Sequence, residues 1–477
     1  MTEPATAPAT GEQRPRPSAT GLLAPAAPTK RRPPAPERPS AWQRLKANRN
    51  FRRGFACVIG FLVLAVMLGP EGSATAPLSG VTSSLFTPRV LIFVGLGLAL
   101  GLVMTAQDRY GPQIRRASDR VTSVPRRLLP DRRARYGFYV AALAFAVVVP
   151  MHISGYWQGV LVQQIGIYVL LALGLNVVVG FAGLLDLGYV AFYAIGAYTA
   201  AYWSGALPVH PPIVLNMFWI IPFAILAAML AGVILGTPTL RLRGDYLAIV
   251  TLGFGEIIEI VATNLGGFTG GAQGALGIPH FRFNLLGLHY VWGIADLPYY
   301  YLLLGFVVIS MVAFWSLDNS RVGRAWSAIR EDEVAAEASG INVLKYKVMA
   351  FAIGASTAGF AGLLTASQIS YINPGDFTVQ VSILILVLVV FGGMGSIWGA
   401  LIGAAVIEWF QWFLQVHPLF GYQPQDLYMY LGALLIVMMI FRPEGMIPSR
   451  RRKREIGLAE HGVGTADALS EPVGQAV

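Results

Sequence analysis

Long apolar stretches recur along the whole chain, and they restrict the folds that it can adopt. Twelve stretches reach or approach the roughly 20 helical residues that cross the hydrocarbon core of a bilayer. They lie at residues 54–69, 90–106, 137–154, 158–180, 184–203, 212–236, 245–263, 299–316, 348–367, 379–395, 397–414 and 427–441. Only 13% of the residues are charged, about half the share that is usual in soluble domains. The sequence therefore predicts an all-α, polytopic transmembrane helical bundle of about 10–12 spans, some of them broken or short.

The basic residues are distributed unevenly between the two sides that these spans define. With the amino terminus inside, the cytoplasmic segments are 1–53, 107–136, 237–244, 317–347 and 442–477. Of the 35 Lys and Arg residues, all except Arg89 and Arg282 then lie in the cytoplasm, as the positive-inside rule requires. We therefore expect a multi-pass protein with both termini cytoplasmic. Topology and anionic lipid explain the basic clusters, so no nucleic-acid partner is expected.

Composition also suggests a division of the chain into four parts. Residues 1–53 form a Pro/Ala-rich basic tail that we expect to be disordered. Residues 54–136 hold two amino-terminal spans and a basic cytoplasmic loop, 137–445 form the main transmembrane domain, and 446–477 form a basic carboxyl-terminal tail. The single cysteine, Cys57, excludes an intrachain disulfide and any multi-cysteine metal site.

A charged island at 318–346 interrupts the apolar spans and is predicted to form two short helices. Asn319 or Ser320 can cap the first helix. One face of that helix carries the apolar residues Val322, Ala325, Trp326 and Ile329. The second helix runs from about Asp332 to Ser339, and Gly340 ends it as a left-handed cap. Because Ala335, Ala336 and Ala338 give it little side-chain bulk, it can enter a groove of a partner protein.

Glycine clusters break the apolar pattern at 180–188, 266–279 and 391–396. Backbone that leaves helical geometry at membrane depth must be buried in protein or line a wet cavity, so these breaks indicate a pathway. The long, almost uncharged external loop at 266–279 is expected to form a vestibule. In contrast, Gly354, Ala358 and Gly362 have the small-xxx-small spacing that is typical of close helix packing.

A few carboxylates fall within the apolar stretches. Glu256 and Glu259 share a helix face, and Glu256 lies near the middle of its span. Asp186 lies near the cytoplasmic end of its span, and Glu408 lies in another span. Such residues are costly in lipid unless they face the bundle interior or are protonated. Three roles remain open: a structural anchor between helices, contact with a solute, or a step in a proton relay.

The chain has no recognisable catalytic or nucleotide-binding motif. Neither HExxH nor CxxC occurs. None of the five lysines follows a glycine, which excludes a GKS or GKT phosphate loop. If ATP drives this protein, another subunit binds the nucleotide, and no enzymatic activity is predicted for the chain itself.

Several separated motifs in order resemble the permease family of branched-chain amino acid ABC importers, in particular the longer of its two paired permeases. The motifs are RLRGDYLAIVTLGFGEI at 241–257, GGAQGALGIP at 270–279, AIREDEVAAEASGI at 328–341, VVFGGMGSIWGALIGA at 389–404 and FRPEGMIP at 441–448. The resemblance covers about 137–450. It identifies the island as the ABC coupling loop, with the leading Glu of the family motif displaced to Glu333.

The resemblance implies a heteromeric importer of the prokaryotic cytoplasmic membrane. Its expected partners are two cytoplasmic ABC ATPases, a second and homologous permease, an extracytoplasmic substrate-binding protein and membrane lipid. ATP and Mg would be used by the ATPases, and this chain would bind no cofactor or metal. Leucine, isoleucine and valine are the expected cargo, with urea, short amides or other amino acids as alternatives. An ion-coupled secondary carrier and a structural or receptor-like membrane protein are the remaining alternatives.

Two sets of residues are expected to carry the function. The coupling set consists of Arg330, Glu331, Asp332, Glu333, Ala335, Ala336, Glu337 and Gly340. The translocation set consists of Tyr246, Thr251, Glu256, Thr269, Gly270, Gly271, Gln273 and Gly274. A lining of glycine, threonine and aliphatic side chains suits weak contacts with a passing solute, since alternating access driven by ATP confers the direction.

Overall fold

The computed structural model describes residues 132–239, 245–285, 288–293, 295–416, 427–441 and 445–447. The expected tail at 1–53 and the two spans at 54–69 and 90–106 lie outside these residues, as does the carboxyl-terminal tail beyond residue 447.

Ten helical segments in the described part coincide with the ten apolar stretches predicted between 137 and 441. Seven of them are long and apolar enough to cross a membrane. These are the continuous run Gly155–Phe181, α9 (Met217–Thr239), α10 (Asp245–Asn264), α12 (Asp296–Asp318), α15 (Val343–Ile369), α16 (Val379–Gly392) with the preceding η4 (Pro374–Phe377), and α17 (Ile397–Val416). The other three are α5 (Arg132–His152), α8 (Val190–Trp203) and α18 (Leu427–Phe441). The helical membrane bundle is therefore confirmed.

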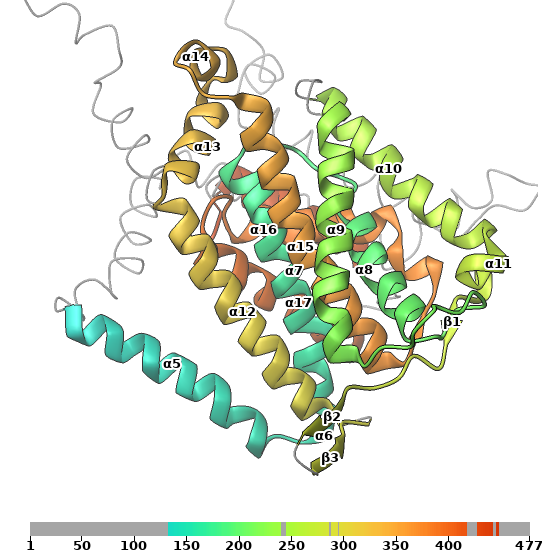
Figure 1. The fold of residues 1–477 in the computed structure, drawn as a ribbon. Coiled ribbons are helices and arrows are strands. Elements are labelled where there is room, and N and C mark those ends of the chain that lie inside the picture. The colour runs from blue at the N-terminus through green and yellow to red at the C-terminus, as the bar shows by residue number, and fades with distance from the viewer. Residues whose placement is uncertain are drawn as a thin grey trace, which may run out of the picture. The chain divides into compact units, whose positions relative to one another are not determined.

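Helix α15 lies at the centre of this bundle (Figure 1). It packs against α8, α9 and α7 (Ile167–Leu175), which belongs to the run 155–181. Small residues allow the close approach, because a Cβ atom at Gly362 would lie 2.1 Å from the Tyr193 carbonyl oxygen. Likewise, a Cβ atom at Gly354 would lie 3.1 Å from the Gly174 carbonyl oxygen. The packing role predicted for the glycines of this helix is confirmed.

The span predicted at 184–203 is only partly helical, and α8 begins at Val190. Its 14 residues extend about 21 Å, less than the ~30 Å hydrocarbon core. The preceding backbone is satisfied by neighbouring groups: the Leu187 N–H donates to Thr251 Oγ1 over 3.0 Å, and the Gly188 N–H donates to Asp186 Oδ1 over 2.9 Å. Because these contacts replace the helical hydrogen bonds, irregular chain persists here inside the protein.

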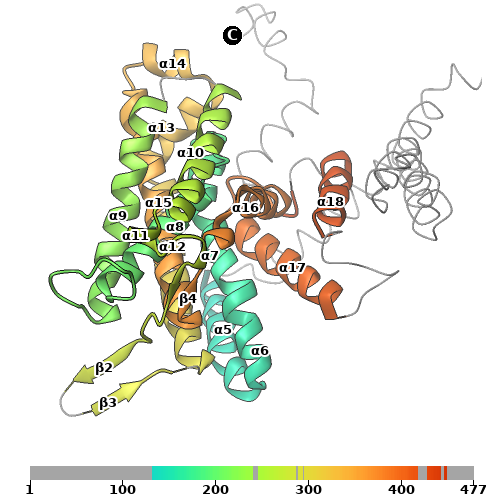
Figure 2. The same cartoon turned by 90° about the vertical axis from the view of Figure 1, so that its right-hand side faces the viewer.

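The two ends of the bundle differ in structure (Figures 1 and 2). One end, the charged end, carries α13 (Arg321–Glu331) and α14 (Glu333–Ala338) between α12 and α15. The opposite end, the hairpin end, carries the antiparallel hairpin of β2 (Arg282–Leu285) and β3 (Leu288–Val291). There the chain also forms α11 (Gly266–Thr269), η3 (Gly271–Gln273) and β1 (Ala275–Leu276), which pairs with β4 (Tyr371–Ile372).

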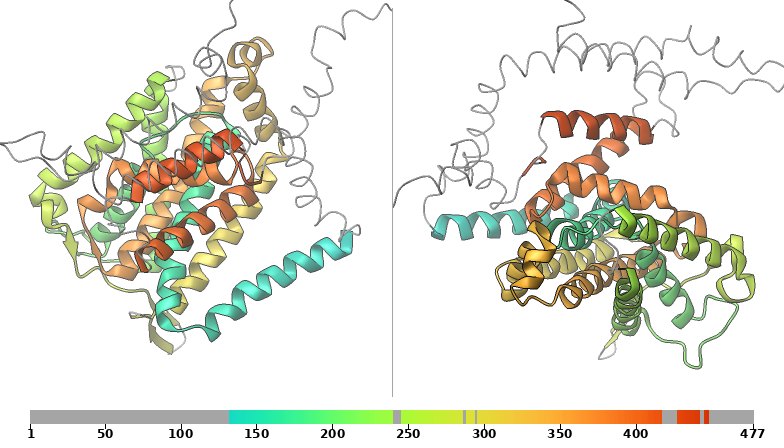
Figure 3. Two further views of the ribbon diagram at one scale, coloured as in Figure 1. Left: turned by 180° about the vertical axis from the view of Figure 1, so that it is seen from behind. Right: turned by 90° about the horizontal axis from the view of Figure 1, so that it is seen from above.

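The carboxyl-terminal helices pack on the side of the bundle formed by α7. Helix α17 contacts α7 and α16, and α16 contacts α18 (Figure 3). Between α16 and α17 the glycine cluster 391–396 breaks the helix, with Gly393 at φ 118° and Gly395 at φ 80°. Glycine is needed at both positions because other residues rarely adopt such positive φ angles. The predicted helix break in this segment is confirmed.

Candidate coupling surface and translocation pathway

Helix α13 is capped at its start and attached to the bundle along one face. The Ser320 hydroxyl oxygen accepts the N–H groups of Val322 and Gly323, so Ser320 is the cap. The side chain of Trp326 is fully buried, and its Nε1–H donates to the Tyr346 carbonyl oxygen over 2.8 Å. The amphipathic pattern predicted for this helix is confirmed: Ala325 and Ile329 are buried as well.

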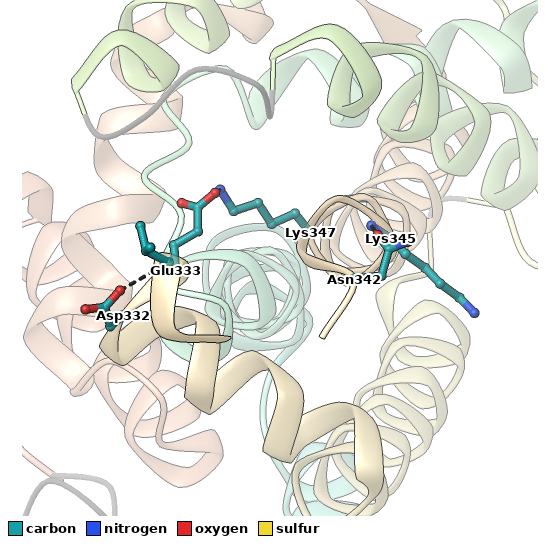
Figure 4. Close-up of polar contacts among 6 residues, drawn as sticks. Asp332, Glu333, Asn342, Lys345 and Lys347 are labelled. Atoms are coloured by element: carbon teal, nitrogen blue, oxygen red, sulfur yellow. Dashed lines mark hydrogen bonds and ion pairs between the residues drawn. The ribbon is translucent and has the colours of Figure 1, made fainter. Parts of the chain in front are cut away.

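Helix α14 starts one residue later than predicted, because Asp332 caps it from outside. Oδ1 of Asp332 accepts the N–H of Val334 over 2.9 Å and that of Ala335 over 3.0 Å. Gly340, at φ 84°, follows the helix in the left-handed conformation, as predicted for a residue that ends a helix. The short helix therefore has a defined start and a defined end, and Figure 4 shows the capping side chain of Asp332.

The structure separates the expected coupling residues into two groups. Six of them are exposed: Arg330, Glu331, Asp332, Ala335, Glu337 and Gly340. Two others are turned toward the chain itself, since Ala336 is buried and Glu333 forms an ion pair with Lys347. The exposed group, which we call the coupling surface, is acidic and has little bulk at Ala335 and Gly340.

Arg330 connects α13 with the glycine-rich breaks of the bundle. Its guanidinium donates a hydrogen bond to the carbonyl oxygen of Gly180, at the end of η2 (Asn176–Phe181). The Gly395 N–H, from the other break, donates to Oδ1 of the buried Asn176 over 2.8 Å. Two breaks far apart in the sequence therefore meet next to Arg330. The glycine clusters predicted helix breaks at these two places, but the contact of the breaks with each other and with Arg330 was not predicted.

Helix α10 presents two of the expected translocation residues on an exposed face. Tyr246 is 71% exposed and Glu256 is also exposed, close to the middle of the helix. No hydrogen-bond or ion-pair partner of Glu256 exists in the described part of the chain. A carboxylate at this depth is costly against lipid. This face is therefore one that water or another protein would have to cover.

The remaining expected translocation residues differ in their exposure. Thr251 is completely buried and accepts the Leu187 N–H. Thr269 is also buried, and its hydroxyl donates to the Ala262 carbonyl oxygen over 2.6 Å. At the hairpin end, Gln273 is exposed among glycines at positive φ, namely Gly270, Gly271 and Gly274. Both threonines thus stabilise the shape of α10 and its loop, whereas Gln273 is accessible.

Two further acidic residues are enclosed by the chain. Oδ1 of Asp186, which is completely buried, accepts the Gly188 N–H in the irregular segment before α8. Oε1 of Glu408 in α17 accepts Nε2–H of Gln411 over 3.0 Å. Each of these hydrogen bonds joins residues two or three positions apart in the sequence. Among the described residues, no group of three or more His, Cys, Asp or Glu side chains could hold a metal ion.

A multi-pass helical bundle with a short, capped and exposed helix between two spans is the arrangement expected of a membrane permease of the ABC type. The family model described as branched-chain amino acid transport system / permease component matches residues 159–441. The chain belongs to this family. Members of this family of ABC permease subunits lack ATPase domains.

Individual relatives agree with this assignment. The high-affinity branched-chain amino acid transport system permease protein LivM of Escherichia coli K12 is 39% identical over 333 residues, which are 66% of this chain and 75% of the relative. The permease protein BraD of Pseudomonas aeruginosa, from a system of the same description, is 29% identical over 59% of this chain and 91% of its own length. LivH of Salmonella typhimurium is 32% identical over 27% of this chain and 40% of its own length. No solved structure matches.

Proposed function

We propose that this chain is one of two permease subunits of an ATP-driven importer for leucine, isoleucine and valine. The carrying observation is the coupling surface on α13 and α14, which is exposed, acidic and held by caps at the charged end of the bundle. A small helix with these properties fits a groove of a partner. The names of LivM and BraD support the cargo, and the similarity to LivH supports a second, related permease.

In this proposal the charged end faces the cytoplasm, and two ATPases there use ATP and Mg. An extracytoplasmic binding protein delivers the amino acid to the hairpin end, where the loop 266–279 receives it. The exposed face of α10 with Glu256 lines the pathway. This role accounts for an exposed carboxylate near mid-span, since water or protein covers that face rather than lipid. Both termini are cytoplasmic, and the inner membrane of a prokaryote is the location.

The proposal is tested by uptake of labelled leucine into proteoliposomes that contain the purified complex of this chain with its partners. We expect ATP-dependent uptake with wild type, and a loss of at least about tenfold, equivalent to about 1.4 kcal/mol, with Ala335→Arg. The bulky cation would prevent close docking of the coupling surface. Thr237→Arg is the matched control, because Thr237 is exposed on α9 outside the coupling surface.

Normal assembly and transport by Ala335→Arg would contradict the coupling assignment. Uptake that follows an ion gradient without ATP would instead indicate a secondary carrier. Cargo is tested separately, by comparing the binding of labelled leucine, isoleucine and valine with that of urea and short amides to the partner binding protein. Preference for urea or an amide would contradict the proposed cargo and leave the importer class intact.

A further inference from the structure

A buried lysine at the start of α15 forms an ion pair with the first residue of α14. Nζ of Lys347 lies 2.8 Å from Oε1 of Glu333, and the side chains are 2% and 29% exposed, respectively. Removing an ammonium group from water is costly unless a partner compensates its charge. Glu333 therefore supplies the negative charge that compensates the buried ammonium group of Lys347. Figure 4 shows the two side chains meeting between the helices.

The pair connects helix α14 to the bundle, and the backbone changes direction on either side of this helix. Asp332, which separates α13 from α14, is extended at φ −155° and ψ 113°, whereas Gly340 after α14 has φ 84°. A helix of six residues between two such changes of direction can pivot about them unless another contact holds it. The ion pair is such a contact, in addition to the burial of Ala336, because it joins the first residue of α14 to Lys347 near the start of α15.

Adjacent positions of α15 hold both helices of the coupling loop. The Tyr346 carbonyl oxygen accepts Nε1–H of Trp326 from α13, and the next residue, Lys347, holds α14 through Glu333. Helix α15 in turn packs along α7, α8 and α9. A displacement of α14 that pulls on Lys347 would thus act directly on the central helix of the bundle.

We propose that Lys347 is a positioning residue that transmits the movement of α14 to α15 through Glu333. The inference rests on the proposed function, since it assigns the mechanical link within that ATP-driven cycle. Glu333 then acts inward, whereas Glu331 and Glu337 on the coupling surface remain available to the partner. The acidic residues of the loop therefore divide between two tasks.

The test compares cargo transported per ATP hydrolysed in the reconstituted complex. With Lys347→Met, which keeps an unbranched side chain without the charge, we expect assembly and ATP hydrolysis to persist and this ratio to fall at least tenfold. Glu333→Gln should also lower the ratio. Lys347→Arg, and the charge exchange that combines Glu333→Lys with Lys347→Glu, should keep the ratio closer to the wild-type value. Lys345→Met is the matched control, because Lys345 is exposed and points away from Glu333 (Figure 4).

Each other outcome contradicts the proposal. An unchanged ratio in Lys347→Met and Glu333→Gln would exclude a role in coupling. A parallel fall in assembly, hydrolysis and uptake in both variants, at constant ratio, would show that the pair only stabilises the fold. Failure of the wild-type complex to take up amino acid with ATP would refute the proposed function itself, and it is recognised independently because it precedes any substitution.

Discussion

Helices α15 and α10 have almost the same mean hydropathy but different surroundings. In spite of this similarity, 72% of the apolar stretch of α15 is buried inside the chain and only 28% of that of α10. The difference follows from side-chain size and charge. Helix α15 presents Gly354, Ala358 and Gly362 to its neighbours, whereas α10 presents Glu256 on an exposed face. Both helices are thus apolar enough to cross the membrane, and the small residues of α15 allow the close packing that places it at the centre of the bundle.

This difference divides the work of the two helices in the proposed mechanism. Helix α15 begins at the coupling loop and continues through the packed centre, so it is suited to transmit movement. Helix α10 has an exposed face that carries a carboxylate, so it is suited to line a pathway with a second subunit. Three substitutions test this division, in order of decreasing effect.

The largest effect is expected for Gly362→Leu in α15. A Cβ atom there would lie 2.1 Å from the Tyr193 carbonyl oxygen and 2.7 Å from the Ala197 nitrogen. Both contacts are with backbone of α8, which cannot move aside without separating the helices. Overpacking of this kind should destabilise the fold by about 3 kcal/mol or more. Thermal unfolding in detergent, together with the yield of monodisperse protein, measures the loss.

The matched control is Gly253→Ala in α10. A Cβ atom at Gly253 has no heavy atom within 4 Å, and alanine favours a helix over glycine by about 1 kcal/mol. We expect unchanged or slightly higher stability. Equal losses in the two variants would show that the central position of α15 has no special packing requirement.

An intermediate effect is expected for Glu256→Leu. Because Glu256 is exposed and has no hydrogen-bond or ion-pair partner within the described chain, its removal should change the stability by no more than about 0.5 kcal/mol. ATP-dependent uptake should nevertheless fall roughly tenfold, equivalent to about 1.4 kcal/mol. Glu256→Gln separates the loss of charge from the loss of polarity, and Ile260→Leu on the same exposed helix is the control. Wild-type uptake by Glu256→Leu would remove α10 from the pathway.

The smallest effect is expected at the start of α15, where Oδ1 of Asn342 accepts the Lys345 N–H over 3.0 Å. Asn342→Ala removes this helix cap and should cost about 1 kcal/mol in stability. Asn342→Ser retains a capping oxygen and should behave like wild type. If the alanine variant also lowers cargo per ATP while the serine variant does not, the first turn of α15 affects coupling as well as stability.

Regular hydrophobicity made much of the fold predictable. The ten helical segments that coincide with the predicted spans between 137 and 441 were expected, because a bilayer core requires long apolar helices. The caps and the left-handed Gly340 of the coupling loop follow from local hydrogen bonding and backbone sterics, so they too could be predicted. The start of α8 was predicted only in part: the glycine cluster 180–188 indicated a break, but the span was placed from residue 184. Hydrogen bonds to Thr251 and Asp186 keep the chain irregular until Val190, and the contact with Thr251 depends on how α10 is packed.

For the two sets of site residues, the sequence predicted the location in the chain but not the exposure of each side chain. From the sequence, all eight coupling residues belonged to one exposed loop, and all eight translocation residues to one helix and the loop after it. Their exposure depends on which neighbours are packed around them. Thr251 is buried because α10 lies against the irregular segment before α8, and Glu333 turns inward because Lys347 is buried within reach.

The sequence by itself determined that this chain is a helical membrane protein with a charged loop between two spans and no nucleotide site of its own. These properties depend on local composition and spacing, which are the same however the helices pack against one another. Only the tertiary structure decided that two glycine breaks meet at Arg330 and that α15 is held to the coupling loop by Lys347. Such contacts join residues far apart in the chain or on different helices, and their free energy exists only once the helices are packed.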